Sequence, residues 1–92
     1  MIRTWGSSVA RRFAEQGKAK LSGLDREAGL ELLAALDAAT SLTDLSPLKS
    51  VGLHKLTGDR KGQRAMIING PWRVCFRFQA GDAWEVEIVD YH

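Results

Sequence analysis

The chain has 92 residues, and we expect one domain over residues 1–92. Apolar residues make up 45% of the chain and occur only in short runs, which excludes a disordered protein and predicts no membrane span. The single cysteine, Cys75, cannot form an internal disulfide, which fits a reducing cytoplasm and excludes a disulfide scaffold.

The net charge of +2 is distributed unevenly along the chain. Residues 49–77 carry seven lysines and arginines against one acid, whereas residues 78–92 carry four acids and no lysine or arginine. A basic segment of this kind favours a polyanionic partner, usually nucleic acid. A solvated loop with scattered strand arginines explains the charge equally well, so both interpretations stay open.

The N-terminal stretch "MIRTW" predicts a short strand by its alternation. The next segment, "SSVARRFAEQG", predicts a short helix that a serine caps and that Gly17 ends. Val9 and Phe13 are spaced to share one face of this helix.

The segment "DREAGLELLAALDAAT" predicts a longer helix with Asp25 as its N-cap. Leu32, Leu33 and Leu36 form its buried stripe, and small alanines allow close packing. The segment "SLTDLSPLKSVG" is expected to be a connection with room for one helical turn.

The second half of the chain has a sequence pattern that is typical of β-strands. Four runs predict strands, namely "LHKL", "QRAMII", "WRVCFRFQ" and "AWEVEIVDY". A polar loop, "GDRKG", follows the first, and glycine turns join the other three into an antiparallel meander. The fold class is therefore α+β, with two N-terminal helices packed on one face of a small antiparallel sheet.

Alternation in "WRVCFRFQ" separates an aromatic face from a basic one. The aromatic face should lie under the helices, which leaves Arg73 and Arg77 on the opposite side. Arginines near the centre of a sheet need a partner, because desolvation is costly. Two partners are open: Glu85 and Glu87 on the next strand as cross-strand ion pairs, or the phosphate oxygens of a ligand.

The two histidines stand at the start and the end of the strand-forming half. A short sheet can bring His54 and His92 to one end, together with Asp90, Tyr91 and Arg73. Two groups that titrate near neutrality on either side of a phosphate can cleave RNA without a metal. One takes the proton of a ribose 2′-hydroxyl, the other protonates the departing 5′-oxygen, and a cation stabilises the transition state. A structural histidine on a half-buried strand is the commoner alternative.

Other chemistries have little support in the sequence. No CxxC, HxH or HExxH spacing is present, so we expect no metal and no cofactor. The glycines Gly58 and Gly62 around "DRK" are too close together for a phosphate-binding loop and favour a plain connection.

The run "GLHKLTGDRKGQRAMIINGPWRVCFRF" followed by "VEIVDYH" resembles the HigB type of bacterial toxin in the RelE/ParE superfamily. The likeness lies in L-H-x-L-x-G-D-x-x-G, then N-x-x-W-R-V-x-F, then a terminal D-Y-H, with support from "LDAATSLTDL" and the opening I-R-x-aromatic. It covers essentially the whole chain. Arg64 and Pro71 depart from the usual pattern and could alter RNA or antitoxin contacts.

The resemblance implies a compact RelE-like fold and a toxin that cuts mRNA in the A site of the 70S ribosome. Cleavage would need no metal. The implied partners are a HigA-type helix-turn-helix antitoxin, the ribosome and mRNA, all in the cytoplasm.

The resemblance also implies roles for individual residues. His54, Asp90 and His92 would share proton transfer, with the general base open among them. Tyr91 would orient the mRNA, and Arg73 would bind the scissile phosphate. RNA contact would fall to Lys55, Arg60, Lys61 and Arg77. If these roles are right, the catalytic groups at the end of the last strand lie at the rim of the sheet.

Two alternatives belong to other classes of function. ParE-type relatives share the fold but inhibit DNA gyrase by binding, and they would not need paired histidines. An RNA-binding or ribosome-binding module without catalysis is the other alternative.

Overall fold

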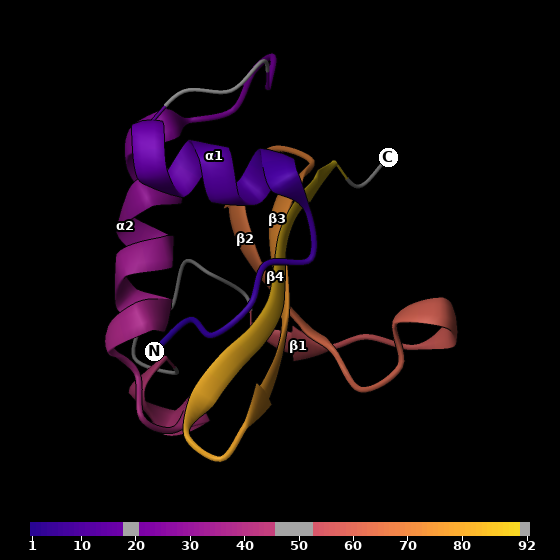
Figure 1. Ribbon diagram of the computed structural model, residues 1–92. Helices are drawn as coiled ribbons and strands as arrows, with labels where there is room; N and C mark the ends of the chain where they lie inside the picture. The colour runs from indigo at the N-terminus through magenta and orange to yellow at the C-terminus, as the bar shows by residue number, and fades with distance from the viewer. Residues whose placement is uncertain (18–20, 46–52, 91–92) are drawn as a thin grey trace.

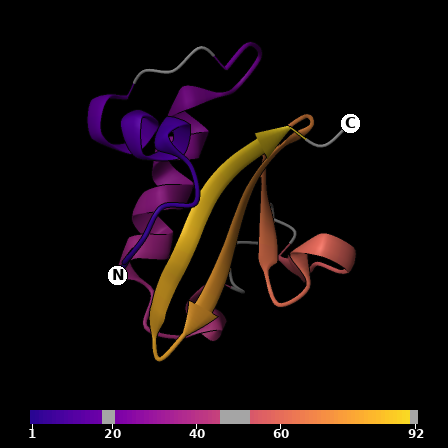
Figure 2. The ribbon, with the colours of Figure 1, turned by 45° about the vertical axis from the view of Figure 1, so that its right-hand side comes forward.

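The computed structural model describes residues 1–17, 21–45 and 53–90, with the backbone alone at His54. Its elements in chain order are α1 (Ser8–Gln16), α2 (Arg26–Ala38), η1 (Leu42–Asp44), β1 (His54–Lys55), η3 (Gly58–Arg60), β2 (Arg64–Asn69), β3 (Trp72–Gln79) and β4 (Asp82–Asp90). The strands form one antiparallel sheet in the order β1-β2-β3-β4. Both helices lie on one side of this sheet and η3 lies on the other (Figures 1 and 2). The predicted α+β class is confirmed.

The helices begin and end where the sequence predicts. The Ser7 side chain accepts a hydrogen bond from the backbone of Ala10 at 3.2 Å, and Gly17 ends α1 in the left-handed region at φ 65°. Asp25 caps α2 in the same way at 3.1 Å. Val9 and Phe13 lie four residues apart on α1, as the predicted helix requires, but only Phe13 is buried, and Val9 is 40% exposed.

The core fills the space between the helices and the sheet. Phe13 from α1 and Leu33 and Leu36 from α2 pack there with the aromatic face of β3. The two helices meet at Gly29, where a Cβ atom would lie 3.1 Å from the ring of Phe13. The missing side chain at Gly29 therefore leaves room for the Phe13 ring.

The first residues lie along β4 without forming a regular strand. Ile2 and Trp5 make isolated parallel bridges to Ala83 and Val86. The predicted strand is interrupted because β4 bulges at Glu85, whose φ is 54°. The backbone N–H of Glu85 donates to the Thr4 hydroxyl at 2.8 Å instead of to a carbonyl.

The meander of β2, β3 and β4 is confirmed, and so is the alternation in β3. Val74 and Phe76 are buried in the main core, whereas Cys75 belongs to a second cluster on the other face. The strand predicted for "LHKL" is reduced to His54–Lys55. The Leu56 backbone N–H still donates a hydrogen bond to the Gln63 carbonyl at 2.9 Å. Within the described ranges, no helix is long and apolar enough to cross a bilayer.

Candidate nucleic-acid interface on the open face of the sheet

We call the sheet face turned away from the helices the open face. By strand register it carries Ala65, Ile67, Arg73, Cys75, Arg77, Trp84, Glu87 and Val89. Its floor is a small apolar cluster in which Leu56, Ala65 and Cys75 are buried and Val89 packs against them. Charged side chains surround this floor, so the open face combines an apolar centre with a polar rim.

Arg73 is fixed at one end of the open face by backbone carbonyls. Its Nη1 donates to the carbonyl of Gly70 at 2.6 Å and to that of Trp72 at 3.0 Å. Of the carboxylates in the described ranges, none forms an ion pair with Arg73. The guanidinium is therefore oriented but keeps its positive charge available for an anion.

The turn that carries this arginine is anchored to the helical layer. The Asn69 side chain donates to the Gly23 carbonyl at 2.8 Å and accepts from the backbone N–H of Asp25 at 2.8 Å. The indole of Trp72 donates to the Ser22 carbonyl at 3.2 Å. These bonds tie the β2–β3 turn to the start of α2, which holds the backbone around Arg73 in place.

Arg77 has the cross-strand partner that one of the two predictions named. Its Nε pairs with the Glu85 carboxylate, and its Nη1 donates weakly to the Lys61 carbonyl at 3.4 Å. The guanidinium lies directly under Gly62, where an added Cβ would approach Nη1 to 2.5 Å. Arg77 therefore supports the loop between β1 and β2 from below.

Glu87 pairs with a residue that alternation did not indicate. Its carboxylate accepts from Nη1 of Arg60 at 2.6 Å, and the same nitrogen donates to the Gln63 side chain at 3.0 Å. Gln63 is only 9% exposed. The prediction that both strand arginines pair with Glu85 and Glu87 is thus right for Arg77 and wrong for Arg73. The reason is that the polar loop folds back over the open face and brings Arg60 to Glu87.

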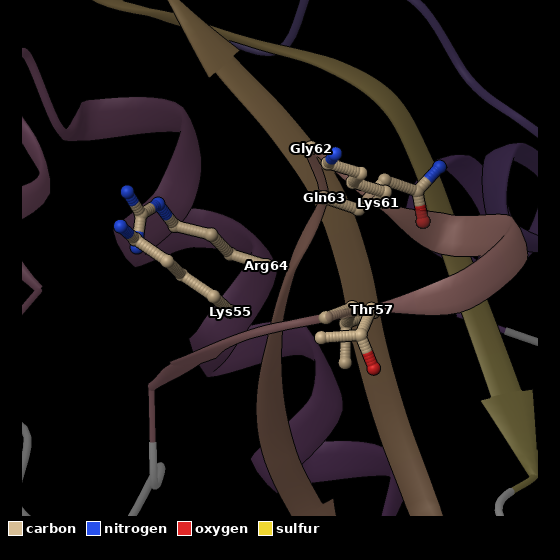
Figure 3. Close-up of a pocket in the computed structure, with 7 residues that line it drawn as sticks. Lys55, Thr57, Lys61, Gly62, Gln63 and Arg64 are labelled. Atoms are coloured by element: carbon tan, nitrogen blue, oxygen red, sulfur yellow. The ribbon is translucent and has the colours of Figure 1, made fainter.

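A hollow of about 590 Å³ lies at the β1–β2 hairpin (Figure 3). The residues that line it are Lys55, Leu56, Thr57, Lys61, Gly62, Gln63 and Arg64. Three of these are cations and none is an acid. Two of the predicted RNA contacts, Lys55 and Lys61, therefore border a single cavity.

The described backbone brings some of the predicted catalytic positions together. His54 pairs with Ala65, Ala65 with Cys75, and Cys75 with Glu87, so these four residues form one row across the sheet. Arg73 lies two residues along β3 from this row. Strand geometry then gives a Cα separation of roughly 12 Å between His54 and Arg73.

Asp90 is the last residue of β4 and pairs with Trp72, in the row next to that of Arg73 and Val89. It is exposed, and alternation assigns it to the helix-side face at the rim of the sheet. The predicted catalytic residues Tyr91 and His92 lie outside the described residues.

The carboxyl groups with perturbed titration lie away from this face. Hydrogen bonds from Thr40 and Ser41 lower the pKa of Asp44 in η1. A hydrogen bond from Arg3 lowers the pKa of Asp82, at the end of β4 that is remote from Asp90. Across residues 1–17, 21–45 and 53–90, no group of three His, Cys, Asp or Glu side chains is arranged to hold a metal ion.

The architecture agrees with what comparison with known proteins finds. A family model described as "RelE-like toxin of type II toxin-antitoxin system HigB" matches residues 6–92. The endoribonuclease HigB of Proteus vulgaris is 38% identical over 60 residues, which cover 65% of this chain and 64% of that relative. Because the family model spans nearly the whole sequence, the chain belongs to the HigB family of RelE-like toxins of type II toxin–antitoxin systems.

Proposed function

We propose that this toxin is a ribosome-dependent endoribonuclease that stops translation by cutting mRNA in the A site. The observation that carries the proposal is Arg73, a guanidinium fixed by two backbone carbonyls on the open face and without a carboxylate in the described ranges. A preoriented cation of this kind stabilises the charge of a phosphorane-like transition state. The name of the relative from Proteus vulgaris, an endoribonuclease, supports the same reaction.

The reaction would use the bound RNA as its own nucleophile. A base removes the proton of a ribose 2′-hydroxyl, and the 2′-oxygen attacks the adjacent phosphorus. The bond from phosphorus to the 5′-oxygen breaks, and an acid protonates that oxygen. The products are a 2′,3′-cyclic phosphate and a 5′-hydroxyl, and no metal is required.

His54, Asp90 and His92 are the proposed proton-transfer groups, with Tyr91 orienting the substrate. The backbone of His54 lies in the row of Cys75, two residues along β3 from Arg73. Asp90 lies one row beyond Arg73 at the rim of the sheet, on the helix-side face, so it would act on a phosphate that reaches around the end of β4.

The proposed RNA contacts differ in how available they are. Lys55 and Lys61 are exposed beside the hairpin hollow. Arg60 and Arg77 are held by Glu87 and Glu85, so an RNA phosphate would replace a carboxylate there. We assign the first pair to initial capture and the second to contacts that form once the RNA lies on the open face.

The proposed partners follow from the toxin class. Family membership implies an antitoxin, and we propose a HigA-type helix-turn-helix protein. The ribosome and its mRNA are the targets, which places the toxin in the cytoplasm. Gyrase inhibition of the ParE type would not need His54 in the sheet, and it would not need an Arg73 that pairs with no carboxylate of the described residues.

The test is a cell-free translation reaction with one defined mRNA, run beside the same mRNA without ribosomes. We expect fragments that end inside the coding frame and carry a 2′,3′-cyclic phosphate, only when ribosomes are present. His54→Ala should abolish them, and Arg26→Ala, which removes an exposed cation from α2, should not. Intact mRNA with unaffected translation would contradict the proposal, and DNA supercoiling by gyrase would then be assayed.

A further inference from the structure

Two cations oppose each other across the β1–β2 hairpin. Lys55 pairs with Arg64 in the antiparallel register, so their side chains leave the same face of the two strands. Figure 3 shows both side chains extending in the same direction, with their nitrogen-bearing ends close together. Cβ atoms in such a pair are roughly 5 Å apart, and like charges that face each other at this spacing destabilise the sheet.

No acid in the part of the chain that the structure describes forms an ion pair with either cation. Neither Lys55 nor Arg64 forms an ion pair or a side-chain hydrogen bond with another described residue. The contrast with the open face is direct, because Arg60 and Arg77 each have a glutamate there. The hairpin therefore carries a pair of cations that costs stability in the free protein.

The pair is distinct from the proposed catalytic position. Arg64 also pairs with Phe76, whose side chain belongs to the main core on the helix side. Arg73, by contrast, lies on the open face. Since β1 is the edge strand of the sheet, the two cations lie around that edge from the open face.

We propose that Lys55 and Arg64 form a second phosphodiester-binding site, which holds an RNA strand where it passes over the edge of the sheet. A phosphate seated between the two cations would cancel their repulsion, and the guanidinium can donate two parallel hydrogen bonds to its oxygens. Thr57 and Lys61 line the same hollow, but Figure 3 shows them on the other side of the hairpin from the ends of Lys55 and Arg64, so the site consists of the two facing cations. The choice of RNA as the ligand rests on the proposed function.

RNA fits this site better than an acidic protein segment does. The site continues the basic segment of residues 49–77 from the open face onto the edge strand, so one polyanionic strand can contact both. The seven residues of the hollow include no acid that would repel closely spaced phosphates. Arg64 completes the pair with Lys55 across the hairpin.

The experiment measures RNA binding without ribosomes and without cleavage. The first probe is a fluorescein-labelled single-stranded RNA of mixed sequence. The second has the same sequence with 2′-deoxy sugars throughout, so it lacks the 2′-hydroxyl that cleavage needs. Each probe is titrated with purified toxin at several NaCl concentrations. The test variant is the double substitution Lys55→Gln and Arg64→Gln. The matched control is Arg12→Gln and Arg26→Gln, which removes the same charge from exposed positions on the two helices.

Two lost phosphate contacts should reduce the slope of log affinity against log salt by about 1.4, at about 0.7 per contact for single strands. Affinity near physiological salt should fall about tenfold or more in the test variant and much less in the control. Without RNA, the test variant should melt at or above the temperature of the wild type, because the repulsion is gone.

An unchanged salt slope in the test variant would overturn the site. Unchanged RNA binding together with lost binding of polyglutamate would overturn RNA as its ligand and favour an acidic protein.

The proposed nuclease is judged separately. If the wild type fails to cut mRNA on ribosomes while the test variant loses RNA binding, the nuclease proposal fails and the site stands. If the wild type cuts and the test variant binds as the wild type does, the site alone fails.

Discussion

Gly62 offers a direct test of how the β1–β2 loop is held. Its φ of 91° is in the left-handed region, and an added Cβ would approach the Arg77 guanidinium to 2.5 Å. Gly58, in the same loop, has a φ of 67° with nothing within 4 Å of an added Cβ. Gly62→Ala therefore combines backbone strain with a steric conflict, whereas Gly58→Ala has the strain alone.

The expected magnitudes follow from these two contributions. An alanine in the left-handed region costs about 1–2 kcal/mol, which both substitutions share. The conflict at Gly62 is relieved if Arg77 moves off Glu85, so it costs at most what that half-exposed ion pair contributes. Such pairs are worth about 0.5–1 kcal/mol. We therefore expect Gly62→Ala to lower the free energy of unfolding by about that much more than Gly58→Ala does.

Urea denaturation of a double-mutant cycle isolates this contribution. In the Arg77→Ala background the steric conflict is absent, so the excess cost of Gly62→Ala should disappear while the backbone strain remains. The comparison of one substitution in two backgrounds cancels any difference in strain between the two glycines. An excess that persists without Arg77, or no excess in the wild type, would refute the account of the loop.

Three further predictions concern stability. Phe13→Ala should lower the free energy of unfolding by about 3–5 kcal/mol in urea, since Phe13 is 1% exposed, and a loss below about 1 kcal/mol would contradict its place in the core. Arg60→Ala should cost about 1–2 kcal/mol by the same assay, because the buried Gln63 loses a donor; no change would show that the contact is unimportant. The hydrogen bond from Arg3 lowers the pKa of Asp82 below the unfolded value of about 3.9, so its stabilisation is present above that pH and is lost as pH falls through the folded pKa. In Asp82→Asn, the free energy of unfolding should therefore fall less steeply as the pH drops below about 4 than it does in the wild type. An equally steep fall in the two proteins would contradict this.

Local signals predicted the elements well. The caps at Ser7 and Asp25 and the left-handed Gly17 depend on neighbouring residues only, and the structure confirms them. Alternation in β3 likewise separated buried Val74 and Phe76 from the arginine face. These features follow from the period of a helix or a strand, which a single sequence displays directly.

Contacts between residues that are distant in the chain could not be predicted from the sequence. The pair of Arg60 with Glu87 depends on a loop that folds back over the sheet, and a separation of 27 residues gives no periodic signal. The approach of Gly29 to Phe13 depends on how two helices cross. Register matters equally, because only the pairing of β1 with β2 shows that Lys55 faces Arg64.

The central claim is that the open face around Arg73 cuts mRNA, and single-turnover cleavage on programmed ribosomes tests it most directly. Arg73→Ala should slow cleavage by about 10²–10³-fold, the usual cost of removing one group that stabilises transition-state charge. Arg12→Ala, a matched loss of one exposed cation from α1, should cleave like the wild type. Urea denaturation should show both variants folded. An Arg73→Ala protein that cuts at the rate of the wild type would contradict the account.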